Sequence, residues 1–213
     1  MPGRIAAEML FVTKTIETLT QEFDLIPEER KNILSGITAF IESRISEHSK
    51  ADLIFICTHN SRRSHIAQIW SQAAAAWYNV TGVNSYSGGT EATAFNVNAI
   101  EAMGKLGFRI SRGSDGKNPR YIVTYADNHH SFEVFSKKYD ESPNPRTGFA
   151  AIMTCTQADA DCPIVSGSAI RISLPYDDPK NFDRTELESA KYTERALEIG
   201  RELLFVFSQI KKR

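Results

Sequence analysis

The sequence has few cysteines, almost no net charge and no long apolar run, and each shortage argues against a class of protein. Three cysteines among 213 residues argue against a disulfide-stapled secreted fold and suit a reducing compartment. The formal net charge of -1 gives no sign of a nucleic-acid or anionic-membrane partner. No apolar run approaches the ~18 residues of a membrane span, and the N-terminus lacks the apolar core of a signal peptide. We therefore expect a cytoplasmic enzyme or binding domain.

Residues 1–49 are predicted to form a helical extension, and residues 50–213 a catalytic domain. Apolar residues recur at alternating spacings of four and three from Ile5 to Phe23, which predicts one amphipathic helix. Pro27 and the two glutamates after it are typical of the first turn of a second helix. The default interpretation is a helical hairpin packed on the main domain, and the alternative is a homodimer through the apolar stripe of these helices.

Strands and helices alternate after residue 50, which predicts an α/β fold built on a mainly parallel sheet with helices on both sides. The polar segment 113–148 is expected to be a long excursion with one helical turn at 132–139. Strands are predicted over 52–57, 83–87, 121–125, 149–154 and 170–174, and helices over 64–78, over 96–106 and from a capping box at Thr185 almost to the C-terminus.

The segment between the first strand and the following helix has the composition of an oxyanion-binding loop. Inward backbone N–H groups and the positive end of the helix dipole hold a tetrahedral anion in such a turn. Cys57, at the base of the loop, lies in a field that favours the thiolate, the nucleophilic form of the side chain. The residues predicted to bind the oxyanion are Thr58, His59, Asn60, Ser61, Arg62, Arg63 and Ser64.

Four side chains of this loop have more specific expected roles. Arg63 offers a planar fork that matches two oxygens of a phosphate-like group. Asn60 tolerates a left-handed backbone conformation, and Ser64 can donate a hydrogen bond to the Cys57 thiolate. Arg62 is expected to face solvent.

Asp178 is the candidate general acid. It follows the last predicted strand, and Pro179 restricts it to an extended conformation that aims its carboxylate back over the end of the sheet. A displacement at phosphorus or arsenic needs an acid that protonates the departing oxygen. A plain Asp-Pro turn is the structural alternative.

Cys155 and Cys162 are predicted to form a redox pair. Two thiols in one polar segment can resolve an oxidised nucleophile by successive thiol–disulfide exchange. Zinc binding is the weaker interpretation, because the sulfurs are widely spaced and His129 and His130 lie far off in the sequence. No metal site is therefore expected.

These residues together resemble the low-molecular-weight protein tyrosine phosphatase superfamily and, within it, the thioredoxin-coupled arsenate reductases. The resemblance implies a central parallel four-stranded sheet flanked by helices. It also implies that Cys57 attacks arsenate, that Asp178 protonates the leaving oxygen, and that Cys155 and then Cys162 pass the resulting disulfide to thioredoxin without a tightly bound cofactor. The matching segments are Ile56 to Ser64, Tyr86 to Glu91, Asn98 to Met103, Thr154 to Pro163 and Tyr176 to Pro179.

The chain departs from the family pattern at several positions. His59 stands where family members usually have glycine, so the loop entrance is expected to differ in shape and charge. Gln68 stands where potassium-binding relatives carry an acidic residue, so we do not expect that ion. The extension has no counterpart in the compact reductases, and the 113–148 excursion is longer than theirs.

Two other functions stay open from the sequence. A phosphatase of the same fold would use the same loop and acid to form a phosphocysteine that water hydrolyses. Lys180 argues against it, because the tyrosine phosphatases usually place tyrosine after Asp-Pro, and a phosphatase has no need of the cysteine pair. A non-catalytic oxyanion sensor is the third reading, which the intact set of nucleophile, arginine and acid disfavours.

Overall fold

The computed structural model describes residues 12–126, 131–162 and 164–211. The predicted start of the first helix at Ile5 and the two histidines, His129 and His130, lie outside them. The helices are α1 (Thr13–Thr20), α2 (Glu28–Ser46), α3 (Arg63–Trp77), α4 (Val97–Lys105), α5 (Thr156–Asp161) and α6 (Glu188–Ser208), with short 3-10 helices η1 (Phe23–Leu25) and η2 (Pro179–Phe182). The strands are β1 (Ala51–Cys57), β2 (Val83–Gly89), β3 (Arg109–Arg112), β4 (Tyr121–Thr124), β5 (Ser131–Val134), β6 (Phe149–Met153) and β7 (Ser168–Ser173).

The central sheet has four parallel strands in the order β2-β1-β6-β7. Successive side chains of a strand point to opposite faces, and β1 is apolar on both. Leu53 and Phe55 belong to a large core that also takes in α2, α3 and α6, whereas Ile54 and Ile56 belong to a smaller cluster beneath α5. Both faces of the sheet are thus covered by helices, and the predicted fold class is confirmed.

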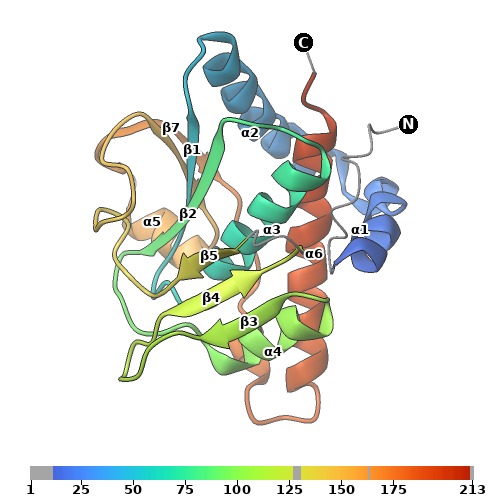
Figure 1. The fold of residues 1–213 in the computed structure, drawn as a ribbon, viewed down its shortest axis with the longest axis vertical. Helices are drawn as coiled ribbons and strands as arrows, with labels where there is room; N and C mark the ends of the chain where they lie inside the picture. Colours follow the sequence, from blue (N-terminus) through green and yellow to red (C-terminus); the bar gives the residue numbers. More distant parts are fainter. Residues whose placement is uncertain (1–11, 127–130, 163, 212–213) are drawn as a thin grey trace.

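The N-terminal helices pack on α6, the long C-terminal helix. Figure 1 shows α1 beside α6, on the side away from the central sheet. Ile16 and Leu19 of α1 and Ile37 and Ile41 of α2 are buried in the same large core as α6. The hairpin therefore packs on the main domain. In the described part of the stripe that the homodimer alternative would use, Val12, Ile16 and Leu19 are buried within their own chain. The domain boundary at residues 49/50 stays a prediction.

A second sheet lies outside the central one, and its two outer strands were missed. Strands β3, β4 and β5 pair antiparallel in sequence order. The strand predicted over 121–125 belongs to this sheet, and the helical turn predicted at 132–139 is wrong. Phe132 pairs across from Val123, so non-local pairing overrides any weak local helical preference of this short segment.

Helix α6 begins at Glu188, two residues later than a capping box with Thr185 as its N-cap predicts. The Thr185 hydroxyl does accept from the backbone N–H of Leu187, at 3.3 Å. The Glu188 carboxylate, however, accepts from the backbone N–H of Arg184, at 2.7 Å, and a capping box would need the N–H of Thr185 itself. The Glu188 hydrogen bond is thus shifted by one residue from the capping-box pattern, and the chain around Thr185 does not form a regular first turn of α6.

Candidate active site

The candidate loop lies at the carboxyl end of the parallel sheet, where α/β folds bind ligands. Cys57 is the last residue of β1 and Arg63 the first residue of α3, so the loop joins the middle of the sheet to a helix N-terminus. Asn60 has φ +44°, the left-handed conformation that an asparagine at this position was expected to tolerate. The strand–loop–helix arrangement predicted around Cys57 is therefore present.

The Cys57 sulfur is part of a buried polar chain. Ser64 Oγ lies 3.1 Å from Cys57 Sγ, and Asn60 Nδ2 donates to the same Ser64 oxygen at 2.9 Å. Because Asn60 occupies an acceptor position of that hydroxyl, the hydroxyl proton is free to point at the sulfur. Ser64 is thus placed to stabilise a negative charge on Cys57.

Both terminal nitrogens of the Arg63 guanidinium are hydrogen-bonded to the protein, whereas its Nε is unpaired among the described residues. Its terminal nitrogens donate to the Tyr176 carbonyl at 2.8 Å and to Asp178 Oδ2 at 2.6 Å. Its Nε is buried and has no hydrogen-bond partner among the described residues. An unpaired buried N–H is unfavourable unless a ligand satisfies it. The guanidinium is therefore suited to an anion, and the structure places it against the predicted acid.

Arg62 does not face solvent, so that expectation is wrong. Its side chain is 13% exposed, its Nε donates to the Tyr192 hydroxyl at 2.9 Å, and its NH2 lies 3.8 Å from Asp183 Oδ2. Tyr192 comes from α6, more than a hundred residues away in the sequence. The guanidinium is committed to the protein, so the contribution of Arg62 to an oxyanion site would be charge and loop shape.

The remaining loop residues are held mainly through their backbones. His59, which is 48% exposed, has its Nε2 3.7 Å from Glu91 Oε2 at the rim of the loop. The Ser61 carbonyl accepts from the backbone N–H of Asn96 at 2.9 Å. The Thr58 hydroxyl instead points toward the other thiols, as described below. Direct side-chain contact of these residues with an oxyanion stays a prediction.

Residues from the 113–148 excursion brace the back of the loop, which the sequence did not reveal. The backbone N–H of Lys137 donates to Asn60 Oδ1 at 2.9 Å, and the Ser136 hydroxyl donates to the His59 carbonyl at 3.1 Å. Gly89 closes the packing, because an added Cβ there would lie 2.7 Å from both Asn60 N and Thr58 O. Backbone contacts of this kind leave no pattern in a sequence.

The three cysteines share one apolar cluster. Cys57, Cys155 and the partly buried Cys162 all belong to or pack on the smaller cluster beneath α5, and all three are free thiols. Cys155 Sγ lies 3.5 Å from the Thr58 hydroxyl and accepts from the backbone N–H of Ala158, which caps α5. Residues 97 positions apart in the sequence thus meet at one face of the sheet, as the redox-pair prediction requires.

His65 is a buried imidazole directly behind the loop. Its Nδ1 lies 3.1 Å from Ser87 Oγ and its ring packs on Phe95, while Nε2 has no partner among the described residues. Burial, with a smaller contribution from the charge of Lys137, holds the pKa of His65 well below its usual range. His65 is therefore neutral and structural at ordinary pH.

The described residues offer neither a metal-ligand cluster nor a helix suited to a membrane. Among the described residues, no group of three or more His, Cys, Asp or Glu side chains is arranged to hold a metal ion. In the same part of the chain, no helix combines the length and the apolar character that crossing a bilayer requires.

Comparison with known proteins finds arsenate reductases among the sequence relatives. Arsenate reductase 2 of Staphylococcus epidermidis is 28% identical over 144 residues, which are 67% of this chain and 88% of that protein. An arsenate reductase of Bacillus cereus is 27% identical over 159 residues, which are 71% and 98% of the two chains. No protein-family model matches the chain. These relatives confirm the resemblance predicted from the sequence.

Solved structures with a similar chain path were also found. A low-molecular-weight phosphotyrosine phosphatase from Vibrio cholerae O395 has a TM-score of 0.48 at 16% identity, over 74% of this chain and 95% of that one. A thioredoxin-dependent arsenate reductase from Corynebacterium glutamicum has a TM-score of 0.41 at 16% identity, over 93% of this chain and 84% of that one. At these TM-scores the likenesses add no evidence on function.

Proposed function

We propose that this chain, a relative of the bacterial arsenate reductases, reduces arsenate to arsenite through Cys57 and a thiol relay. One observation carries the proposal: the nucleophile of an oxyanion loop shares a single apolar cluster with Cys155 and Cys162. A hydrolase needs only the loop and an acid, whereas a reductase also needs thiols that reach the first sulfur. The names of the sequence relatives agree with this reading.

The first step forms a bond between sulfur and arsenic. Arsenate lies in the loop, held by backbone N–H groups and by Arg63, whose unpaired Nε supplies a waiting donor. The Cys57 thiolate, stabilised by Ser64 at 3.1 Å, attacks arsenic. One arsenic–oxygen bond breaks, and the oxygen leaves as water after it takes a proton from Asp178.

Binding of the anion prepares Asp178 for this role. In the free protein, Asp178 Oδ2 accepts a charge-assisted hydrogen bond from Arg63 NH2 at 2.6 Å. An incoming arsenate competes for the same guanidinium. When Arg63 turns to the substrate, the carboxylate of Asp178 is released to take a proton from one As–OH group of the bound dihydrogen arsenate and to pass it to the departing hydroxyl, which leaves as water.

The second step reduces arsenic and oxidises the thiols. Cys155 attacks the Cys57 sulfur, the sulfur–arsenic bond breaks, and its electron pair stays on arsenic, which leaves as arsenite. Cys162 then attacks Cys155, which frees Cys57 and leaves a Cys155–Cys162 disulfide. Because Cys162 is less buried than the other two, the final disulfide forms at the most accessible of the three thiols.

A thiol donor completes the cycle, and we propose thioredoxin or a similar dithiol protein. The chemistry requires two electrons per turnover and no tightly bound cofactor, because the three cysteines provide every sulfur that the relay uses. We also propose that the protein works in the cytoplasm, where thiols are kept reduced. The helical extension over residues 1–49 is proposed to be an accessory to the catalytic domain.

A coupled assay tests the proposal. NADPH oxidation is followed with arsenate, thioredoxin and thioredoxin reductase, beside hydrolysis of an aryl phosphate by the same preparation. We expect arsenate-dependent turnover that is lost when either Cys155 or Cys162 is replaced by serine. Full multi-turnover reduction by either serine variant would sink the relay.

A phosphatase of the same fold is the second candidate. Phosphate ester hydrolysis would use the same three groups, Cys57, Arg63 and Asp178, and the contact of Arg63 with Asp178 at 2.6 Å supports this use as well, so weak hydrolysis is expected in any case. Phosphate release that is rapid and indifferent to Cys155 and Cys162, with no arsenate-dependent turnover, would favour this candidate.

A further inference from the structure

The short segment between β7 and η2 carries both the predicted acid and a support of Arg63. The Tyr176 carbonyl accepts from Arg63 NH1 at 2.8 Å, and Asp178 accepts from Arg63 NH2 at 2.6 Å. Both contacts depend on where this segment lies. A displacement of Tyr176 therefore moves the oxyanion-binding arginine and its carboxylate partner together.

Arg30, in the first turn of α2, holds this segment from the opposite side. Its NH1 donates to the Pro175 carbonyl at 3.1 Å, directly before Tyr176 in the chain. Its guanidinium carbon lies 4.9 Å from the centre of the Tyr176 ring, which is within the range of a cation–π contact. An N-terminal helix thus contacts both residues that lead into the acid turn.

Glu202 of α6 fixes both partners of this contact. Arg30 donates to its two oxygens, from Nε at 2.9 Å and from NH2 at 2.7 Å, and the Tyr176 hydroxyl donates to Oε2 at 2.7 Å. Glu202 is only 5% exposed, so its charge depends on Arg30. Burial, followed by the charge of Glu202, raises the pKa of Tyr176 well above its usual value, so the hydroxyl keeps its proton and its bond.

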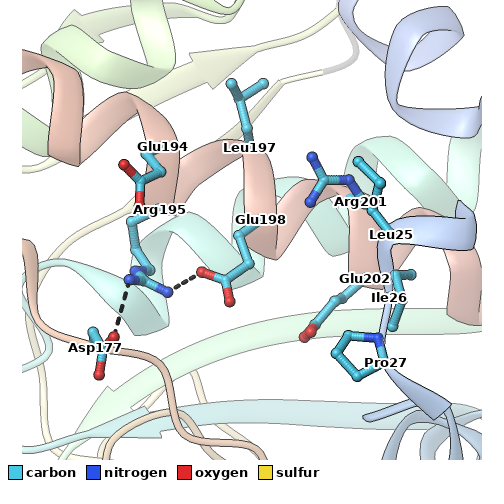
Figure 2. A pocket seen from close by; sticks show the side chains of 10 residues that line it. All are labelled: Leu25, Ile26, Pro27, Asp177, Glu194, Arg195, Leu197, Glu198, Arg201 and Glu202. Atoms are coloured by element: carbon cyan, nitrogen blue, oxygen red, sulfur yellow. Dashed lines mark hydrogen bonds and ion pairs between the residues drawn. The ribbon is translucent and has the colours of Figure 1, made fainter. Parts of the chain in front are cut away.

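The neighbouring part of the segment has little apolar packing. Figure 2 shows a pocket of about 430 Å³ between Leu25–Pro27 and α6, with Asp177 at its edge. Asp177 is almost fully exposed, and its nearest described cation, Arg195 NH2, lies 3.5 Å away and also pairs with Glu198. Arg30 and Glu202 therefore support the acid turn together with the backbone N–H of Tyr176, which donates to the Thr154 carbonyl at 3.2 Å, and Arg62, whose Nε lies 4.0 Å from Asp178 Oδ1.

The geometry points to Arg30 as a positioning residue of the oxyanion site, which acts through the Pro175–Tyr176 segment on Arg63 and Asp178. Among the described residues, Arg30 contacts Pro175, Tyr176 and Glu202 rather than the loop itself. The inference rests on the proposed function only in taking Arg63 and Asp178 as the working groups, which reduction and phosphate ester hydrolysis both use. It gives the N-terminal helices a role in the chemistry as well as in packing.

Two variants with a matched control test the inference. Arg30→Met removes the guanidinium and keeps an apolar stem, while Arg30→Lys keeps a charge beside Glu202 without the fork. Arg201→Met is the control, because Arg201 also ties the N-terminal region to α6, by donating to Glu22 Oε2 at 2.6 Å, but does not contact the segment over 175–178. Their side chains are similarly exposed, 17% for Arg30 and 21% for Arg201.

A further variant separates positioning from folding. Arg30→Met leaves the buried Glu202 charge uncompensated, which lowers stability in its own right. The double variant Arg30→Met/Glu202→Gln removes that charge and keeps an oxygen that accepts from the Tyr176 hydroxyl. Thermal unfolding of each variant is measured beside its kinetics, so that loss of folded protein is corrected for.

The two measured quantities depend on the loop and the acid but not on Cys155 or Cys162. Arsenate affinity is measured as protection of Cys57 from alkylation, followed on the Cys57 peptide by mass spectrometry, and kcat/KM is measured with an aryl phosphate. For Arg30→Met and for the double variant we expect both quantities to fall about tenfold, the scale of a modest misplacement of a reacting group. Arg30→Lys is expected to recover part of the loss, and Arg201→Met to stay within about twofold of wild type.

Each outcome decides the question. Near wild-type affinity and kcat/KM in folded Arg30→Met overturn the inference, as does an equal loss in Arg201→Met, which would make the effect a general one of stability. Failure of wild type to reduce arsenate would overturn the proposed function and leave these readouts, which need only the loop and the acid, able to judge Arg30.

Discussion

The loop over 57–63 and the thiol segment over 155–162 are held in different ways. Side chains or backbone groups from α3, β2, α6 and the 113–148 excursion bind the loop on every side. The thiol segment is a six-residue helix tied chiefly by Arg171, which donates to the Cys162 carbonyl at 3.1 Å and to Asp159 Oδ1 at 2.6 Å. So short a helix is not stable without such contacts.

The difference matches the two tasks that the proposed reaction sets. Attack on a bound anion gains from a nucleophile fixed in one geometry. A relay requires Cys155 to approach Cys57 and then to turn to Cys162, so its segment must be able to rearrange. A segment that must rearrange during the reaction is expected to have low local stability, which fits the short helix over 156–161, tied chiefly by Arg171.

The largest expected effect comes from comparing a cysteine variant in the loop over 57–63 with one in the thiol segment over 155–162. Cys57→Ser is expected to abolish arsenate reduction and aryl phosphate hydrolysis alike, because no thiolate remains to attack. Cys162→Ser is expected to abolish turnover with arsenate and to leave hydrolysis within about twofold of wild type, because it removes only the last thiol of the relay. Both activities are measured on the same preparations.

A partial loss of both activities in Cys162→Ser would contradict this separation, since it would show that the thiol segment supports the loop. The single-turnover formation of arsenite provides the control, because Cys57 and Cys155 alone are expected to suffice for it.

Ser64→Ala tests the rigid loop at its centre. We expect kcat/KM to fall about 10- to 100-fold for both reactions, because the thiolate loses a hydrogen-bond donor in a buried site. Ser71→Ala is the matched control, since Ser71 is also buried in α3 but pairs with Ser85, at 2.7 Å, on a different turn of the helix. Equal losses in the two variants would mean that α3 packing, not the Cys57 contact, matters.

Arg171→Met tests the looser region. With its main ties removed, α5 is expected to open more often, so alkylation of Cys155 and Cys162 should speed up about fivefold or more. Hydrolysis of an aryl phosphate is expected to stay unchanged, because Arg171 contacts no residue of the loop. A slower hydrolysis in this variant would show that the two regions are mechanically coupled.

The smallest expected effect concerns the pH dependence of stability behind the loop. The pKa of His65 in the folded protein lies below its unfolded value, so the unfolded state binds the proton first and stability falls as the pH drops below about 6.5. His65→Gln, which cannot take up a proton, is expected to lose less stability between neutral and mildly acidic pH. Urea unfolding of both proteins across that range measures the difference, and parallel losses would assign the acid sensitivity to other groups.

Local patterns were enough to predict much of the fold and part of the site. The apolar run before Cys57, the polar turn and the helix after it are adjacent in the chain, and so is the left-handed Asn60. The outer strands of the second sheet, β3 and β5, were not predicted because they are short and are stabilised by pairing with β4 rather than by their own sequence. Arg62 was misjudged for a similar reason, since its partner Tyr192 is far away in the sequence.

Residue types and their spacing alone establish which chemical groups are available: one thiol in an oxyanion loop, a carboxylate after the last strand, and two further thiols. Residue type and local spacing carry that information, because a turn and the helix after it are built from neighbouring residues. Which of these groups lie in contact, however, follows from the tertiary structure and not from the local sequence. The fold gathered the three cysteines in one cluster, set Asp178 against Arg63, and brought Arg30 to the segment that supports them both. Such contacts join residues that are far apart in the sequence and are brought together by packing, so no local sequence pattern predicts them.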